Sequence, residues 1–402
     1  MDLNYSPEEE TFRLKVRRWL EENLPQSGLR GEARIRGDGS TLQKMRDWHR
    51  RLYEAGYLAL SWPKEYGGQA LDPAREAIVN EEMVRARAPG AVGGGISMLG
   101  PTLITWGTEE QKRRYLPKVL TADEIWCQGY SEPGAGSDLA ALRTRAELAG
   151  DEFIINGQKI WTSGAHFSDM MFCLVRTDTQ APKHRGISYV LIDMKTPGIT
   201  VRPLVQMTGD RGFNEVFFDS VRVPRANLVG KLNEGWIVAN TTLFHERNAL
   251  GSTTTTQILF NRLKSLAAAV MRNGKPFTQD PVFRQRLADL EIRVEAMKYH
   301  MLRQLSDSIH GRNPGIAQLV NKLVGTELNH ELSTAAMEVM GDYSMLARAD
   351  ESVLDHGYWP YEWMFSLGLV IGGGTSHIQK NIIAERGLGL PREPKAAPTV
   401  GS

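Results

Sequence analysis

Apolar residues in the first third of the chain recur at the spacing of amphipathic helices. One stripe occupies residues 12–20, directly after Ser6-Pro7-Glu8-Glu9, where a serine, a proline and a glutamate take the N-cap, N1 and N3 positions of a capping box. A second stripe occupies residues 42–52. Residues 108–111 repeat the capping pattern and begin a helix that we expect to stop before Pro117. The N-terminal third is therefore predicted to be helical.

The period of the apolar positions changes to two from about residue 125, as expected for strands. Short apolar or alternating runs, separated by Gly, Pro and Asp, occupy residues 170–175, 189–192, 201–204 and 216–223. Asn156-Gly157 follows the apolar residues 153–155 and is a strong signal for a hairpin turn. The pattern predicts a compact β-barrel or sandwich.

The helical pattern returns after Gly235 and continues to about Arg386, with Gly251 and the run of threonines at 253–256 expected inside the first long helix. Helices, then strands, then helices predict an α+β fold with segregated elements. We place the domains at residues 1–124 (all-α), 125–232 (β-barrel) and 233–390 (helical), with a flexible tail at 391–402.

Composition narrows the class of protein. The chain has 402 residues, 41% of them apolar, and a net charge of +1, which gives no footprint for nucleic acid or an anionic membrane surface. Its two cysteines exclude a disulfide framework, and its nine histidines show no metal-ligand spacing. No signal peptide is visible, and no apolar run approaches the roughly 18 residues that span a bilayer. We expect a cytoplasmic protein with no membrane span, no metal and no nucleic-acid partner.

Residues 129–138, Gly-Tyr-Ser-Glu-Pro-Gly-Ala-Gly-Ser-Asp, carry the strongest chemical signal. Glycine has no Cβ and lets a backbone approach a flat or charged ligand, and a turn of this kind presents N–H groups and serine hydroxyls to one side. On its own, such a loop is either an ordinary turn or a cradle for a pyrophosphate or a ring edge.

This stretch closely resembles the flavin-contacting signature of the acyl-CoA dehydrogenases. Further matching segments lie in the family's order at residues 107–117, 156–164, 217–224 and 373–379, so the resemblance covers about residues 5–390. It implies the three-domain acyl-CoA dehydrogenase fold: a helical N-terminal domain, a middle β-barrel domain and a C-terminal four-helix bundle.

The resemblance implies one FAD per subunit. In the family, the tryptophan at the position of Trp161 stacks beside the isoalloxazine ring; taken alone, Trp161 reads as a core aromatic at a strand end. The implied flavin-contacting residues are Gln128, Tyr130, Ser131, Gly136, Ser137, Trp161, Thr162, Ser163, Thr375 and Gln379. The implied substrate-contacting residues are Ser137, Arg247 and Gly374.

The resemblance also implies the reaction, in which an acyl-CoA thioester becomes the trans-2-enoyl-CoA as a carboxylate removes the α-proton and the β-hydride passes to flavin N5. Many family members carry the catalytic glutamate directly before the Gly-Thr pair of the C-terminal motif, where this chain has Gly373. A subset places the glutamate on the first long helix of the C-terminal domain, before an arginine, and Glu246-Arg247 matches that pair. Without the resemblance, Glu246 reads as a solvated helix residue.

Two departures from the family bear on assembly. The arginine that reaches the flavin of a neighbouring subunit is shifted here, at Arg272, and Glu338 replaces a glutamine that makes a similar contact. The resemblance implies a homotetramer that passes electrons to an electron-transfer flavoprotein. The alternative is a cofactor-sharing or non-catalytic subunit of a heterotetramer. The length, branching and ring content of the acyl group are not specified by the sequence.

Overall fold

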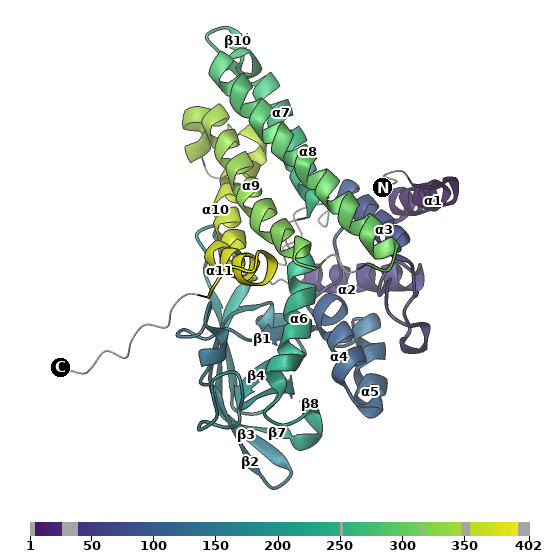
Figure 1. The fold of residues 1–402 in the computed structure, drawn as a ribbon, viewed down its shortest axis with the longest axis vertical. Coiled ribbons are helices and arrows are strands. Elements are labelled where there is room, and N and C mark those ends of the chain that lie inside the picture. Colours follow the sequence, from purple (N-terminus) through teal and green to yellow (C-terminus); the bar gives the residue numbers. More distant parts are fainter. Residues whose placement is uncertain (1–4, 26–38, 250–251, 313–314, 347–353, 393–402) are drawn as a thin grey trace, which may run out of the picture. The chain divides into compact units, whose positions relative to one another are not determined.

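The structure, a computed structural model, describes residues 5–25, 39–249, 252–312, 315–346 and 354–392 (Figure 1). They form two compact units, one of Met1–Ala249 with Ser308–His310 and one of Leu250–Asp307 with Gly311–Ser402. The tail expected at 391–402 lies almost wholly outside the described residues. No helix in the described ranges is both long enough and apolar enough to cross a membrane.

The N-terminal helices confirm the capping signals. They are α1 (Pro7–Asn23), α2 (Gly39–Glu54), α3 (Pro73–Arg85), α4 (Gly100–Trp106) and α5 (Glu109–Leu120). Both halves of the capping box are present at Ser6 and at Thr108. The expected stop before Pro117 is wrong, because α5 continues past the proline. Proline removes one helical hydrogen bond, but the last turn is stabilised by burial of the side chains around it in the core.

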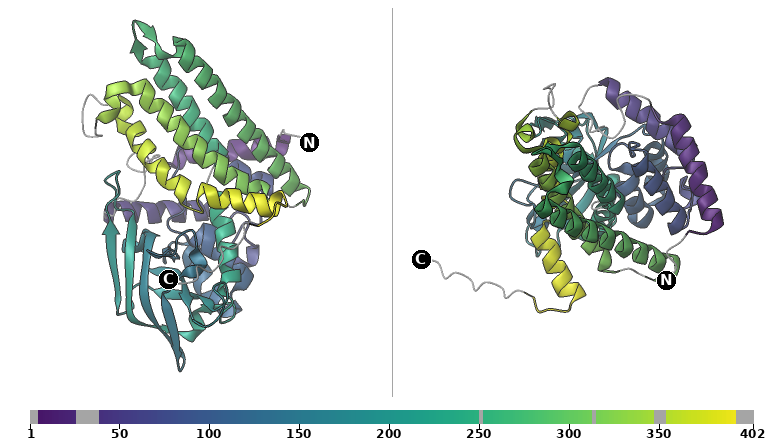
Figure 2. Two further views of the ribbon diagram at one scale, coloured as in Figure 1. Left: turned by 60° about the vertical axis from the view of Figure 1, so that its left-hand side comes forward. Right: turned by 90° about the horizontal axis from the view of Figure 1, so that it is seen from above.

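The middle segment forms one sheet of eight strands with the order β6-β7-β3-β2-β4-β5-β8, and β1 pairs in parallel with β4 (Figure 2). The strands are β1 (Trp126–Gly129), β2 (Arg145–Ala149), β3 (Glu152–Ser163), β4 (Met170–Arg176), β5 (Ile187–Asp193), β6 (Ile199–Leu204), β7 (Phe213–Pro224) and β8 (Leu228–Val229). The predicted barrel thus takes the form of a curled sheet whose hydrogen-bonded order ends at β6 and β8.

The two faces of this sheet bury different cores, and β4 shows how. Phe172 and Leu174 join a core shared with α4, α5 and α6 (Gly235–Ala249), whereas Met171 and Cys173 point to the other face and join a core shared with β3 and β7. All seven residues of β4 are buried. Strand periodicity therefore sorts neighbouring residues between two apolar environments.

The hairpin predicted at Asn156-Gly157 is wrong, because β3 runs straight through both residues. The turn lies earlier, between β2 and β3, which pair antiparallel from Ala149 and Glu152. Asn156 instead accepts a hydrogen bond at its Oδ1 from the backbone N–H of Ser220 at 2.8 Å, where the register with β7 shifts by one residue. Pairing of β3 with β7 therefore outweighs the local preference of Asn-Gly for a turn.

The second unit is helical. It contains α7 (Thr253–Ala269), α8 (Pro281–Ile309), α9 (Ala317–Met340), α10 (Tyr358–Ile371) and α11 (Ser376–Ile382), with a short hairpin of β9 (Met271–Arg272) and β10 (Lys275–Pro276). The side chains of α7, α8 and α9 share one apolar core. The threonine run at 253–256 begins α7, which Ser252 caps, so it does not continue the preceding helix as predicted.

Candidate active site

The loop after β1 is held by a buried ion pair. Glu132 accepts hydrogen bonds from the backbone N–H groups of Arg143 and Thr144 at 2.6 and 2.9 Å. Lys159, fully buried on β3, donates to Glu132 Oε1 at 2.8 Å and to the Tyr130 carbonyl at 3.0 Å. Burial raises the pKa of Glu132, but the Lys159 charge and these hydrogen bonds outweigh burial and hold that pKa below its ordinary value. The loop backbone is thereby fixed from beneath.

The glycines of this loop lie in or directly after a tight turn, with open space beside the backbone. Glu132 and Ala135 exchange backbone hydrogen bonds across Pro133-Gly134, which closes a tight turn. Neither Gly134 nor Gly136 has a positive φ, and a Cβ on either would meet no atom within 4 Å. The space beside the backbone at these two glycines is therefore open.

Trp161 stands out of the sheet at a bulge. Between Lys159 and Thr162, β3 has one residue more than β7 opposite it. Trp161 sits in that bulge with φ +59, a conformation that bulky residues rarely adopt, and the residue is 58% exposed. The ring meets Phe213 edge-on at 5.9 Å. A large aromatic that is strained and exposed at once is typical of a ligand-stacking position rather than the core.

The hydroxyl-bearing residues divide by burial. Ser137 and Ser163 are exposed, and Ser131 is half-buried, with its carbonyl accepting from the N–H of Ile160 at 2.9 Å. Thr162 is buried, and its Oγ1 has no hydrogen-bond partner in the structure. The exposed and half-buried hydroxyls are accessible to a ligand from solvent.

Glu246 is half-buried in the last turn of α6, and the amide of Gln128 donates to its carboxylate, Nε2 to Oε2, at 3.1 Å. The sequence predicted Gln128 as a flavin contact, and its link to Glu246 carried no sequence signal because the two residues are 118 positions apart. The side chain of Arg247, predicted to contact substrate, lies outside the described residues.

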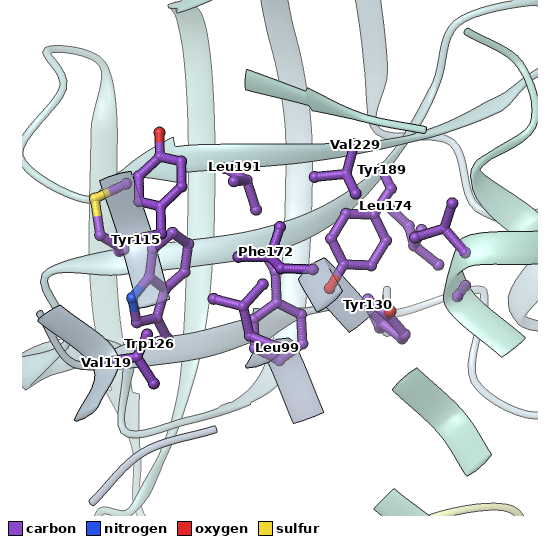
Figure 3. Close-up of a cluster of buried hydrophobic side chains, with 14 of the residues drawn as sticks. Leu99, Tyr115, Val119, Trp126, Tyr130, Phe172, Leu174, Tyr189, Leu191 and Val229 are labelled. Carbon is purple, nitrogen blue, oxygen red and sulfur yellow. The ribbon is translucent and has the colours of Figure 1, made fainter. Parts of the chain in front are cut away.

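Tyr130 lies beside this pair but inside the core. Its ring packs edge-on against Phe172 and Tyr189, as Figure 3 shows. Its hydroxyl is buried without a hydrogen-bond partner. Burial, followed by the neighbouring Tyr189 and Glu246 among other groups, holds the pKa of Tyr130 well above its ordinary value, so the phenol stays protonated.

The predicted residues of the second unit cluster around a glycine loop. Thr375 caps α11, and Gln379, fully buried, donates from Nε2 to the Gly373 carbonyl at 2.9 Å, while its Oε1 has no partner. Buried Lys322 donates to the carbonyls of Val370 and Gly374 at 3.0 and 2.6 Å.

The two positions that depart from the family pattern have partners within this unit. Arg272 lies over the ring of Phe277 at 5.3 Å, and Glu338 forms an ion pair with Arg286. No group of three or more metal-ligating side chains is found among the described residues.

These features fit a flavin. The exposed indole of Trp161 offers a stacking surface. The backbone at Gly134 and Gly136 is open, and the exposed hydroxyls of Ser137 and Ser163 can hydrogen-bond to a ligand.

Comparison with known proteins agrees over nearly the whole chain. The family models for the acyl-CoA dehydrogenase N-terminal, middle and C-terminal domains match residues 6–123, 127–221 and 233–388. Acyl-CoA dehydrogenase IpdE1 of Mycobacterium tuberculosis is 41% identical over 397 residues, which is 96% of this chain and 99% of that protein.

Two solved structures have the same fold. The "Tcur3481-Tcur3483 steroid ACAD" superposes with a TM-score of 0.84 at 31% identity, covering 98% of this chain and 100% of that one. The ChsE4-ChsE5 complex from Mycobacterium tuberculosis gives a TM-score of 0.84 at 33% identity, with the same coverage. The sequence-based prediction of family and fold is therefore confirmed: the chain belongs to the acyl-CoA dehydrogenase family, whose members are FAD-dependent oxidoreductases acting on acyl-CoA thioesters.

Proposed function

We propose that this enzyme uses Glu246 as the base that removes the α-proton of the acyl-CoA. The observation that carries the proposal is the Gln128–Glu246 hydrogen bond on a half-buried helix end, together with Gly373 at the position of the usual base. A glycine has no group to accept a proton. A carboxylate that is partly withdrawn from water and held by a donor is suited to general-base work.

The residues that we propose to hold the cofactor lie in the loop after β1 and at the bulge in β3. FAD, when bound, accepts the hydride that leaves the β-carbon. We assign Trp161, Ser131, Ser137 and Ser163 to holding it, since all four carry side chains accessible from solvent. Thr375 and Gln379 stay predicted flavin contacts, and Gly374 a predicted substrate contact.

The test is the rate at which acyl-CoA reduces the flavin, measured by stopped flow at saturating substrate. Glu246→Gln keeps size and hydrogen bonding but removes basicity, so the rate should fall about 10²–10⁴-fold, with flavin content unchanged. Glu110→Gln, an exposed carboxylate in the first turn of α5, is the matched control and should keep the parental rate. A parental rate in Glu246→Gln would remove Glu246 from the reaction.

We further propose a bulky, ring-bearing acyl group. One structural relative is described as a steroid dehydrogenase of this class, and glycine at 373 leaves no side chain there to narrow a pocket. Three probes separate the substrate classes: cholan-24-oyl-CoA, octanoyl-CoA and 3-methylbutanoyl-CoA. The steroid thioester should have the highest kcat/KM. Preference for octanoyl-CoA would point instead to ordinary fatty-acid β-oxidation.

For assembly we propose a tetramer that passes its electrons to an electron-transfer flavoprotein in the cytoplasm. Cys127 and Cys173 are both buried and unpaired, which suits a reducing compartment. The alternative, a heterotetramer, is favoured by the relative solved as a complex of two named chains. Light scattering and flavin absorbance of the chain purified alone separate the two: a yellow tetramer supports the homotetramer, and a colourless smaller species supports a missing partner subunit.

A further inference from the structure

Gln128 is a polar residue at a position where the fold buries aromatics. Trp126, Gln128 and Tyr130 alternate along β1 and its continuation, and therefore point to the same face of the sheet. Trp126 and Tyr130 are 0% and 4% exposed in the core that this face shares with α6. Gln128 itself is half-buried, and the part of its amide that is withdrawn from water costs free energy unless it is hydrogen-bonded. Its donor hydrogen bond goes to Glu246 Oε2.

The helix that carries Glu246 is fixed one turn earlier. Thr242, fully buried, shares a hydrogen bond with Thr102 of α4 at 2.9 Å and donates to the Tyr189 hydroxyl at 3.4 Å. Thr241 accepts from the indole N–H of Trp106 at 2.9 Å. These contacts fix the backbone of α6, whereas the glutamate side chain keeps its own rotatable bonds, and a hydrogen bond to the carboxylate itself limits their freedom.

We propose that Gln128 is a positioning residue that orients Glu246 and favours its ionised form. This inference rests on the proposed role of Glu246 as the base. An amide N–H donated to a carboxylate stabilises the charged form against the cost of partial burial, because a neutral donor adds attraction without adding charge. It also restricts the carboxylate to the rotamer in which Oε2 meets Gln128. Gln128 thereby acts through Glu246 and not on the flavin.

The test measures the protonation of Glu246 directly, without substrate. In pH-difference infrared spectra of the flavin-loaded enzyme, the carboxyl band that disappears in Glu246→Gln belongs to Glu246, and its midpoint is followed in each variant. Gln128→Met keeps the shape of the side chain and removes the donor. Gln128→Glu keeps the shape and adds a like charge. Gln43→Met is the matched control, because Gln43 donates to Asp47 at 2.8 Å on the exposed face of α2.

Losing a donor to a charged group destabilises the ionised form, so the midpoint should rise by about one to two pH units in Gln128→Met. In Gln128→Glu it should rise further, because two carboxylates that share a site cannot both ionise readily. Flavin reduction by cholan-24-oyl-CoA should slow about 10-fold in Gln128→Met at pH 7, with substrate affinity and flavin content unchanged, and its acid limb should move with the midpoint. Gln43→Met should match the parent in every readout.

Identical midpoints in the parent and Gln128→Met would overturn the positioning role, as would loss of flavin from Gln128→Met, which would return Gln128 to the cofactor site. Either result can occur while Glu246→Gln is inactive, so it leaves the base assignment standing. Conversely, a parental reduction rate in Glu246→Gln would remove the base, whatever the infrared midpoints show.

Discussion

Two loops predicted to meet the cofactor are each held by a fully buried lysine, but the partners of the two lysines differ. Lys159 reaches a carboxylate, Glu132, as well as the Tyr130 carbonyl, and it fixes the loop that follows β1. Lys322 reaches the carbonyls of Val370 and Gly374, at the end of α10. The first is an ion pair between a residue of β3 and a residue of the loop after β1. The second involves the C-terminal end of a helix, where aligned carbonyls carry partial negative charge.

The difference predicts unequal sensitivity. Removing one member of a buried ion pair leaves the other as an unpaired charge, whereas removing a donor from backbone carbonyls leaves neutral acceptors unsatisfied. The loop after β1 should therefore depend more steeply on its lysine than the glycine loop after α10 does on Lys322.

The largest effect is expected for Lys159→Met, which strands the Glu132 carboxylate in a buried site. The free energy of unfolding should fall by about 3–5 kcal/mol, and FAD should be lost because the loop backbone is released. Urea unfolding and flavin absorbance after gel filtration measure both. Lys264→Met is the control, since Lys264 pairs with Glu291 at 3.2 Å on the surface, and should stay within about 0.5 kcal/mol of the parent. If Lys159→Met with Glu132→Gln is no more stable than Lys159→Met alone, a stranded charge is not the cause.

A third buried side chain, the imidazole of His49, also donates to backbone carbonyls, and its contribution to stability should depend on pH. His49 accepts at Nδ1 from the N–H of Val92 at 3.2 Å, so its Nε2 carries the proton and faces the carbonyls of Val119 and Leu120, each at 3.1 Å. Burial lowers the pKa of His49 to about 4 against the raising effect of those carbonyls.

Below pH 6.5 the unfolded chain protonates this histidine and the folded chain does not, so stability should fall as the pH drops from about 6.5 to 4, by about 3 kcal/mol in total. Urea unfolding across that range measures the loss of stability. In His49→Gln, the part of the loss that comes from protonation of His49 should be absent. An equal slope in both proteins would show that His49 titrates alike in the folded and unfolded chain.

A smaller effect is expected for Lys322→Met. The carbonyls of Val370 and Gly374 lose a donor, at a cost of about 1–3 kcal/mol. Thermal unfolding of the variant beside Lys380→Met, whose lysine is exposed, gives the comparison. A loss as large as that of Lys159→Met would mean that the two lysines stabilise their loops in the same way.

The smallest change in stability is expected for alanine substitutions at one glycine from each loop, Gly373 and Gly134. Gly373 has φ +63, so Gly373→Ala should cost about 1 kcal/mol of backbone strain. Gly134→Ala should be close to neutral, since φ is not positive there and its Cβ would meet no atom within 4 Å. Thermal unfolding of the two variants measures the difference. Equal melting temperatures would contradict the expected backbone strain at Gly373.

Local signals predicted the parts of the fold that depend on neighbours in sequence. The capping boxes at Ser6 and Thr108, the short apolar run that forms β4 and the order of helical and strand-rich segments were all predicted from the sequence pattern. The wrong predictions, at Asn156-Gly157 and Pro117, come from places where sheet pairing or core burial outweighs a local preference.

At the candidate site, too, some features were predicted from the sequence and others became visible only in the folded structure. The resemblance to the family predicted roles for Trp161 and Glu246, which stay predictions, but nothing in the sequence indicated that the Gln128 side chain would donate to Glu246. Nor did it indicate that Lys159 and Lys322 would be buried, since lysine is rarely a core residue. Their partners are distant along the chain, so only the folded structure brings them together.

The anchoring of the loop after β1 by Glu132, Thr144 and Lys159 also bears on how the holoenzyme forms. These anchors come from the polypeptide itself, and the loop takes its shape once β3 has paired. Its conformational entropy is therefore lost during folding and not when the cofactor arrives. A cradle preorganised in this way should bind FAD with little further ordering, so flavin can be removed and restored without unfolding the sheet.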